Sequence, residues 1–252
     1  MNQAAESIST DQATGEGAGG VFQTGELKTE QEIQNAARSN MYALMADVFR
    51  YPDQAFRNFV RNGELVDGLN DIVPNLPFEF AVSDQEKSVL RFSDKFSDDD
   101  VESEFIRLFD AGPGDPPCPL VEGKQVKGSN RRTIFESLIR FYNNFGLSYQ
   151  EGSMEDRPDH VSYELEFMHY LAFLTIKALQ DKKETHGYLL AQRDFLERHL
   201  NRWASLLAER MKSILAEIAS PDEAVLFYTC LLQVLARFVT ADFTYLKKLL
   251  AD

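Results

Sequence analysis

The segment over residues 158–181 constrains the fold most, because two separate apolar faces fit on a single helix there. At about 100° per residue, apolar side chains recur with helical spacing. One face carries Val161, Leu165, Met168, Ala172 and Ile176, and the other carries Tyr163, Phe167, Tyr170 and Leu174. A helix that is apolar on two sides packs against neighbours on both. We therefore expect a central helix, with Asp156 as its N-cap and Pro158 in its first turn.

Polar residues crowd the first two turns of this predicted helix. Asp159, His160, Glu164 and Glu166 all lie there. Buried polar groups are costly unless they are paired, so their concentration at one helix end indicates a site. His160 and Glu164 are four positions apart, on one face and within pairing reach. Two interpretations remain open: a polar patch that binds a peptide, or a capped helix start stabilised by a His–Glu pair.

The rest of the chain also has helical periodicity, and no segment alternates as a strand does. Residues 63–83 are expected to be irregular, and residues 110–129 to form a long loop. Capping signals indicate helix starts at Ser83, Asn130 and Ser220, and Gly146 fits a helix end. We predict an all-α fold of about ten helices, in a single globular domain over residues 29–252. The expected helices span residues 30–51, 53–62, 84–96, 98–109, 131–145, 158–181, 186–219 with a break near Asn201, and 221–250.

Residues 1–28 are expected to be a disordered tail. They are rich in small and polar residues and poor in large apolar ones, so they bury too little surface to offset the cost of ordering. Residues 1–27 contain no Lys or Arg, so we expect neither a secretory signal nor a twin-arginine motif. The most apolar window, residues 224–239, is shorter than the ~20 residues of a membrane span. We expect a cytoplasmic protein without membrane insertion.

The strong negative charge limits the possible partners. The formal net charge is −14, which disfavours nucleic acid because phosphate binding needs a basic face. An acidic surface instead favours a basic peptide, although the same charge also keeps a protein soluble. The acidic run Asp98-Asp99-Asp100 has both interpretations, since acids at a helix start also complement the helix dipole.

Catalytic and metal-binding patterns are incomplete in this sequence. Glu166 and His169 match the Glu-x-x-His ligand pair of di-iron bundles, but no second such pair exists. Cys118 and Cys230 form no metal-binding or disulfide pattern and are expected to be reduced thiols. The sequence has no nucleophile elbow, P-loop or dinucleotide fingerprint. We therefore predict a binding protein without metal or cofactor, rather than an enzyme.

Three short motifs resemble those of one protein family. They are Pro158-Asp159-His160 followed by Glu164-Leu165-Glu166-Phe167-Met168, the run Glu104-Phe105-Ile106-Arg107-Leu108-Phe109, and the proline-rich loop Pro116-Pro117-Cys118-Pro119-Leu120-Val121-Glu122-Gly123. In this order they resemble the TorD/DmsD/NarJ family, the cytoplasmic chaperones for maturation of molybdenum enzymes. The proline-rich loop (residues 116–123) is similar to that of the branch serving dimethyl sulfide and ethylbenzene dehydrogenases and selenate and chlorate reductases.

This resemblance implies a system-specific chaperone. Its partner would be the apo catalytic subunit of a molybdenum oxidoreductase of the dimethyl sulfoxide reductase family, and also its twin-arginine signal peptide. The residues implied for client binding are Asp159, His160 and Glu164, with Tyr163, Phe167, Phe109 and Leu120 as apolar neighbours. Two alternatives remain open: an acidic helical adaptor with an unrelated partner, and a small helical metalloenzyme.

Overall fold

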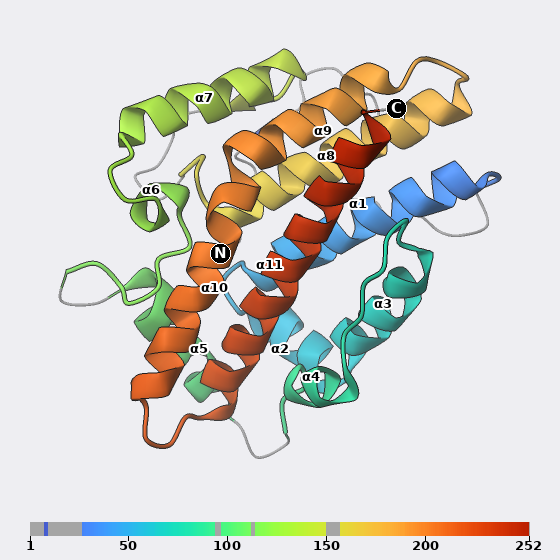
Figure 1. Ribbon diagram of the computed structural model, residues 1–252. Coiled ribbons are helices and arrows are strands. Elements are labelled where there is room, and N and C mark those ends of the chain that lie inside the picture. The colour runs from blue at the N-terminus through green and yellow to red at the C-terminus, as the bar shows by residue number, and fades with distance from the viewer. Residues whose placement is uncertain (1–7, 10–26, 94–96, 112–113, 150–156, 252) are drawn as a thin grey trace.

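The computed structural model describes residues 8–9, 27–93, 97–111, 114–149 and 157–251, and their regular secondary structure is helical apart from one short strand pair (Figure 1). The predicted all-α class is therefore confirmed. The helices are α1 (Glu30–Val48), α2 (Gln54–Arg61), α3 (Glu64–Ile72), the 3₁₀-helix η2 (Val73–Asn75), α4 (Asp84–Val89), α5 (Asp98–Phe105), the π-helix η3 (Ile106–Asp110), α6 (Glu122–Gln125), α7 (Arg131–Asn144), α8 (Val161–Gln180), α9 (His186–Arg198), α10 (Leu200–Glu217) and α11 (Glu223–Leu249).

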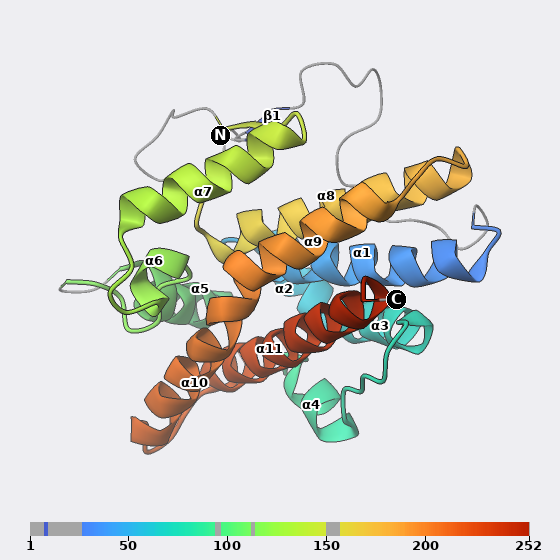
Figure 2. The same ribbon diagram turned by 45° about the horizontal axis from the view of Figure 1, so that its top comes forward.

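Helix α8 is the central helix that its two apolar faces predict. It packs along α1 on one side and α9 on the other, and α11 crosses this layer (Figures 1 and 2). All five residues of the first predicted face are buried. On the second face Phe167 is buried, whereas Tyr163, Tyr170 and Leu174 are partly exposed. One face of α8 thus lies wholly in the core and the other lies at its margin.

Several predicted helix ends coincide with capping contacts. The Ser83 hydroxyl accepts a hydrogen bond from the Glu86 amide, and the Glu86 carboxylate accepts one from the Ser83 amide. The Asn130 side chain caps α7 by accepting from Arg132 N. Gly146 follows that helix with a φ of 77°, the left-handed conformation that glycine adopts without a steric penalty. Local sequence chemistry therefore determines these ends.

Two predicted helix starts are wrong by a few residues. Helix α8 begins at Val161 with His160 as its N-cap, not at Pro158; Asp156 lies outside the described residues. Helix α11 begins after Asp222, whose side chain accepts from Val225 N, rather than after Ser220. In both places the sequence offers several capping residues in succession, and tertiary packing selects among them.

Two predicted irregular segments contain helix. Residues 63–83 include α3 and η2, and the loop over residues 110–129 includes the single turn α6. Helix α3 is short and contains Gly68, so its periodicity is weak. Leu65, Val66 and Leu69 are nevertheless buried, and their burial stabilises the helix.

A short strand pair joins the start of the chain to the end of α7. Strand β1 (Ile8–Ser9) pairs antiparallel with β2 (Ser148–Tyr149), a contact that the sequence pattern does not predict. The rest of the tail over residues 1–28 lies almost wholly outside the described residues, so its predicted disorder stays a prediction.

Within the described part of the chain, α11 alone has the length and hydropathy of a membrane span. Helix α11 has 27 residues, so it is longer than the apolar window over residues 224–239 on which the sequence-based expectation rested. Of its most apolar stretch, 67% is buried inside the fold, as in the core helix of a folded domain. Its apolar side chains therefore have protein partners.

Candidate functional site

The three sequence motifs converge at the start of α8. The proline-rich loop lies between η3 and α8, and backbone hydrogen bonds join it to both. Cys118 N donates to Leu108 O at 2.8 Å, and Val161 N donates to Leu120 O at 2.9 Å. The loop thus joins η3 and the start of α8, which are about 50 residues apart in the sequence, into one structural unit. The order of the motifs in the sequence does not reveal these contacts.

Asp159 organises this unit from a fully buried position. Its carboxylate accepts a hydrogen bond from Gly123 N at 3.0 Å and two from the Arg157 guanidinium, both at 2.9 Å. Its carbonyl oxygen accepts from Glu122 N at 2.9 Å. A Cβ at Gly123 would lie 3.1 Å from the Asp159 carboxylate, so this close approach favours glycine. Asp159 therefore holds the proline-rich loop against the start of α8.

His160 lies beside Asp159 and caps α8. Its Nδ1 accepts from Ser162 N at 3.3 Å and lies 2.7 Å from the Ser162 hydroxyl. Burial lowers the pKa of His160 to about 4, although the nearby Asp159 carboxylate opposes this shift. The imidazole is consequently neutral at neutral pH. Ser162 is therefore the side chain that contacts His160 Nδ1, whereas the four-residue spacing predicted a pair between His160 and Glu164.

Glu164 instead points into the core, where the structure reveals a network that the sequence analysis did not single out. Its Oε2 accepts from Trp203 Nε1 at 3.1 Å. Close by, Glu122 Oε2 lies 2.8 Å from His199 Nδ1, and His199 Nε2 lies 2.8 Å from the Ser137 hydroxyl. The signal in the sequence was Glu122, an acidic residue in an otherwise apolar loop.

The apolar residues expected beside the site are mostly core residues. Phe109 packs its ring 5.0 Å from that of Tyr228, and Phe167 packs 4.8 Å from Phe195, measured between ring centroids. Leu120 is 2% exposed. Of the seven predicted site residues, His160 and Tyr163 are partly exposed and the other five are buried. Of these seven residues, those two are the ones with side chains accessible from outside in this conformation.

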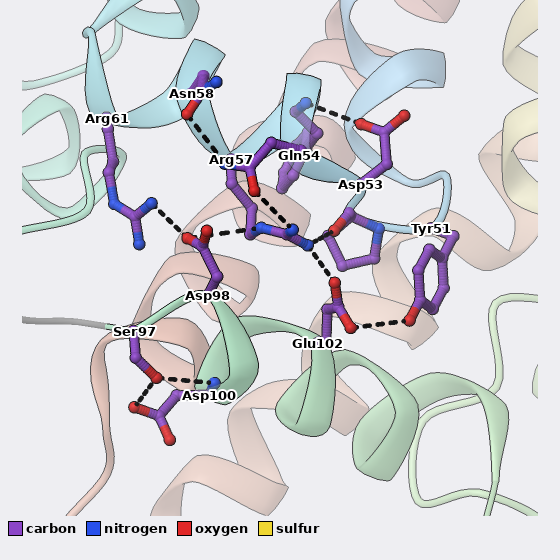
Figure 3. Close-up of polar contacts among 12 residues, drawn as sticks. Tyr51, Asp53, Gln54, Arg57, Asn58, Arg61, Ser97, Asp98, Asp100 and Glu102 are labelled. Carbon is purple, nitrogen blue, oxygen red and sulfur yellow. Dashed lines mark hydrogen bonds and ion pairs between the residues drawn. The ribbon is translucent and has the colours of Figure 1, made fainter.

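The acidic run at the start of α5 is partly neutralised by α2 (Figure 3). Asp98 forms ion pairs with Arg61 and Arg57, and Glu102 pairs with Arg57. The hydrogen bond from Arg61 lowers the pKa of Asp98. Asp99 and Asp100 remain exposed, although Asp100 accepts a hydrogen bond from Ser97. Part of the run thus joins two helices, and part faces solvent.

The Glu-x-x-His pair is engaged in separate contacts. Glu166 forms an ion pair with Arg50. His169 Nδ1 lies 2.9 Å from the Ser39 hydroxyl, and burial lowers the pKa of this imidazole. No cluster of three or more potential metal ligands occurs among the described residues. The predicted absence of a metal stays a prediction.

Both cysteine thiols are buried and unreactive in character. Burial raises the pKa of Cys118 to about 12 and that of Cys230 to about 11. Since the thiolate is the nucleophile, neither residue is activated for catalysis. Cys118 belongs to the proline-rich loop, and its thiol donates to Leu207 O.

An open groove of about 830 Å³ lies elsewhere on the molecule, between α10, α11 and residues 77–79. Its lining contains the buried residues Ala208 and Ala236. The charged lining residues are of both signs, namely Lys212, Arg237, Lys248, Glu79 and Glu209. Lys212 pairs with Glu209, and Arg237 pairs with Glu86 outside the groove.

Comparison with known proteins agrees with the motifs. The family model described as nitrate reductase delta subunit matches residues 80–209. A perchlorate reductase assembly chaperone protein of Dechloromonas aromatica is 31% identical over 220 residues, covering 86% of this chain and 92% of the relative. A chlorate reductase assembly chaperone protein of Ideonella dechloratans is 32% identical, over 70% of this chain and 78% of the relative. A selenate reductase assembly chaperone protein of Thauera selenatis is 29% identical over the same shares.

The fold, the converging motifs and these relatives together define an assembly chaperone of redox enzymes. The chain belongs to the nitrate reductase delta subunit family, which is the TorD/DmsD/NarJ group that its motifs resemble. The chlorate and selenate reductase relatives confirm the branch predicted from the proline-rich loop.

Proposed function

We propose that this chain is a cytoplasmic chaperone that binds the apo catalytic subunit of one molybdenum oxidoreductase of the dimethyl sulfoxide reductase family. It assists cofactor insertion and assembly before the subunit is exported. The observation that carries this proposal is the convergence of η3, the proline-rich loop and the start of α8. This convergence occurs in a chain whose relatives are, by name, assembly chaperones of perchlorate, chlorate and selenate reductases.

The chain acts by binding rather than by catalysis. Its thiols are buried with raised pKa values, and burial keeps the His160 imidazole neutral. Catalysis by a nucleophile or a base requires a group tuned to act near the working pH. A binding role instead requires a stable surface, which the buried Asp159 contacts support at the start of α8.

His160 and Tyr163 are the proposed client contacts. They are the partly exposed members of the predicted site, and their rings lie 6.2 Å apart, measured between centroids. Two aromatic rings at the end of a rigid helix suit an apolar or extended client segment, because little conformational entropy is lost when they bind. Asp159 and Glu164 contribute indirectly by positioning the loop and helix.

The test is client maturation in a strain that lacks the native chaperone gene. His160→Ala and Tyr163→Ala should reduce client activity and the molybdenum content of the client at least about ten-fold, while the melting temperature changes little. His186→Ala and Tyr188→Ala, on α9, are the matched controls and should retain full activity. Full client activity in a folded His160→Ala/Tyr163→Ala variant contradicts these contacts. Retention of client molybdenum in the deletion strain contradicts the chaperone role itself.

The client's twin-arginine leader is a second proposed ligand, and the exposed acids at the start of α5 would receive it. Asp99 and Asp100 are exposed, and an arginine pair needs carboxylates. Binding of a twin-arginine leader peptide should weaken with salt and should weaken further in Asp99→Asn/Asp100→Asn. The control is Asp84→Asn, at the start of α4. Calorimetric titration that shows equal affinity in all three proteins excludes this surface.

A further inference from the structure

A pair of buried carboxyl groups lies where the proline-rich loop meets the helix bundle. Glu122 of α6 and Glu164 of α8 are both fully buried. One oxygen of each has a partner, His199 for Glu122 and Trp203 for Glu164. The other oxygen, Oε1, has no hydrogen-bond partner among the described residues. Leaving a buried carboxylate oxygen unpaired is costly, so the two groups need a protonation state that lowers this cost.

The surroundings favour one protonated carboxyl group. Burial is the main cause that raises the pKa of Glu164 well above its ordinary value. The negative charges of Glu122 and Asp159 also raise this pKa, whereas the hydrogen bond from Trp203 lowers it. Two neighbouring buried carboxyl groups cannot both ionise at low cost, so these surroundings favour the protonated form of Glu164.

The other groups that face the pair leave it no spare cation. They are Ser137 and Tyr142 from α7, Arg157 and Asp159 from the segment before α8, and His199 and Trp203 at the start of α10. Arg157 is bonded to Asp159, and the His199 ring lies between Glu122 and Ser137. Tyr142 stays neutral because burial raises its pKa, and its hydroxyl donates to Pro158 O. A second ionised carboxyl group would therefore be uncompensated by the described residues.

We propose that the proton on Glu164, beside the Glu122 carboxylate, locks the proline-rich loop onto the helix bundle, and that loss of this proton releases the loop. Ionised Glu164 would repel Glu122, which belongs to the loop and to the turn α6 that follows it. The amides of Glu122 and Gly123 both donate to Asp159, so movement of Glu122 breaks those contacts too. The proton passes to water, and no covalent bond other than that O–H bond changes.

Release exposes apolar side chains that the loop buries against the helix bundle. Cys118 is 0% exposed, Leu120 2% and Val121 6% in the closed loop. Use of these side chains for a client rests on the proposed function, whereas the lock rests on the contacts within this chain. The lock is therefore tested on the isolated full-length chain, where the result does not depend on the client.

The sign of the pH dependence follows from the raised pKa. A carboxyl group whose pKa is higher in the closed state favours closure fully at low pH, and that contribution is lost as pH rises through the closed-state value. Alkaline conditions should thus open the loop, and Glu164→Gln should abolish this dependence because the amide is neutral at every pH.

Hydrogen exchange measures the opening directly. The reporters are the amides of Cys118, Gly123 and Val126, each of which is hydrogen-bonded in the closed loop. The exchange rates are first corrected for the intrinsic rate at each pH. Between about pH 5.5 and about pH 8.5, the opening of these loop amides should then increase at least about ten-fold more than the opening of the core amides of α11. In Glu164→Gln, and also in Glu122→Gln, that excess should disappear. The exposed control Glu217→Gln should behave as the wild type.

Two results would overturn the lock. One is wild-type loop opening that follows the α11 amides at both pH values. The other is the same alkaline excess in wild type and Glu164→Gln. The wild-type comparison of loop and α11 amides uses no substitution, so it decides the question even if a variant does not fold.

Discussion

Arg38 of α1 and Asp242 of α11 form a fully buried ion pair, with Arg38 Nη2 donating to Asp242 Oδ2 at 3.0 Å across 204 positions of sequence. The pair is well supplied with further partners. Tyr42 donates to the same carboxylate oxygen at 2.6 Å, and Gln192 accepts from Arg38 at 2.7 Å. These contacts join α1, α9 and α11, and they explain how two charges are tolerated inside the bundle.

Removal of one partner of this pair should strongly destabilise the fold. Arg38→Met leaves the Asp242 carboxylate buried without its cation, which costs about 3–5 kcal/mol of unfolding free energy. The exposed pair Arg132–Glu136 provides the control: Arg132→Met should leave the unfolding free energy nearly unchanged. Urea denaturation measures both. Recovery of stability in Arg38→Met/Asp242→Leu would show that the loss came from the uncompensated charge.

Asp159→Ala should lower stability and loosen the proline-rich loop together. The substitution leaves Gly123 N and the Arg157 guanidinium without their acceptor, at a cost of about 2–3 kcal/mol. Asp159→Asn keeps one acceptor and should lose less. Asp181→Ala, in an exposed pair with Lys183, is the control and should be nearly neutral. Unchanged thermal melting of Asp159→Ala would mean that the carboxylate does not hold the loop.

His160 should make the protein sensitive to acid. Its pKa of about 4 in the folded chain is below its ordinary value of about 6.5, so the unfolded chain binds the proton first as pH falls. Stability is therefore unaffected by this group above about pH 6.5 and decreases between about pH 6.5 and 4. His160→Gln should remove that part of the decrease, as measured by denaturation at a series of pH values. Parallel wild-type and variant curves would contradict the lowered pKa of the His160 imidazole.

Deletion of residues 1–26 should leave the helical domain folded. The segment has few of the large apolar residues that a core requires, and α1 starts with its own capping box between Thr29 and Glu32. The melting temperature of the shortened chain should stay within a few degrees of the wild-type value. A larger decrease would indicate that the tail packs on the domain.

Local chemistry made much of this fold predictable. The Ser83–Glu86 capping box and the Asn130 cap act through residues three or fewer positions away, so the sequence contains the whole interaction. The same holds for the apolar periodicity of α8, whose first face is buried as predicted. Helix α3 was not predicted because its stability comes from contacts of Leu65 and Leu69 with distant residues rather than from its own propensity.

The candidate site was predictable only in part, for the same reason. Asp159 and His160 were recognisable because their motif lies at one helix start, although the N-cap is His160 and not the predicted Asp156. The network around Glu164 was not recognisable, since Glu122, His199 and Trp203 come from separate segments of the chain. Which of several acids at a helix start points inward depends on what packs over it.

The sequence by itself determined the helical class, most helix starts and the family, because each depends on residues that are neighbours in the chain. Tertiary structure decided which residues are buried and which are available to a partner. It placed Glu164 beside Glu122 and Trp203, and it left His160 and Tyr163 at the surface. Burial and charge pairing depend on distances in space, and a one-dimensional pattern does not contain them.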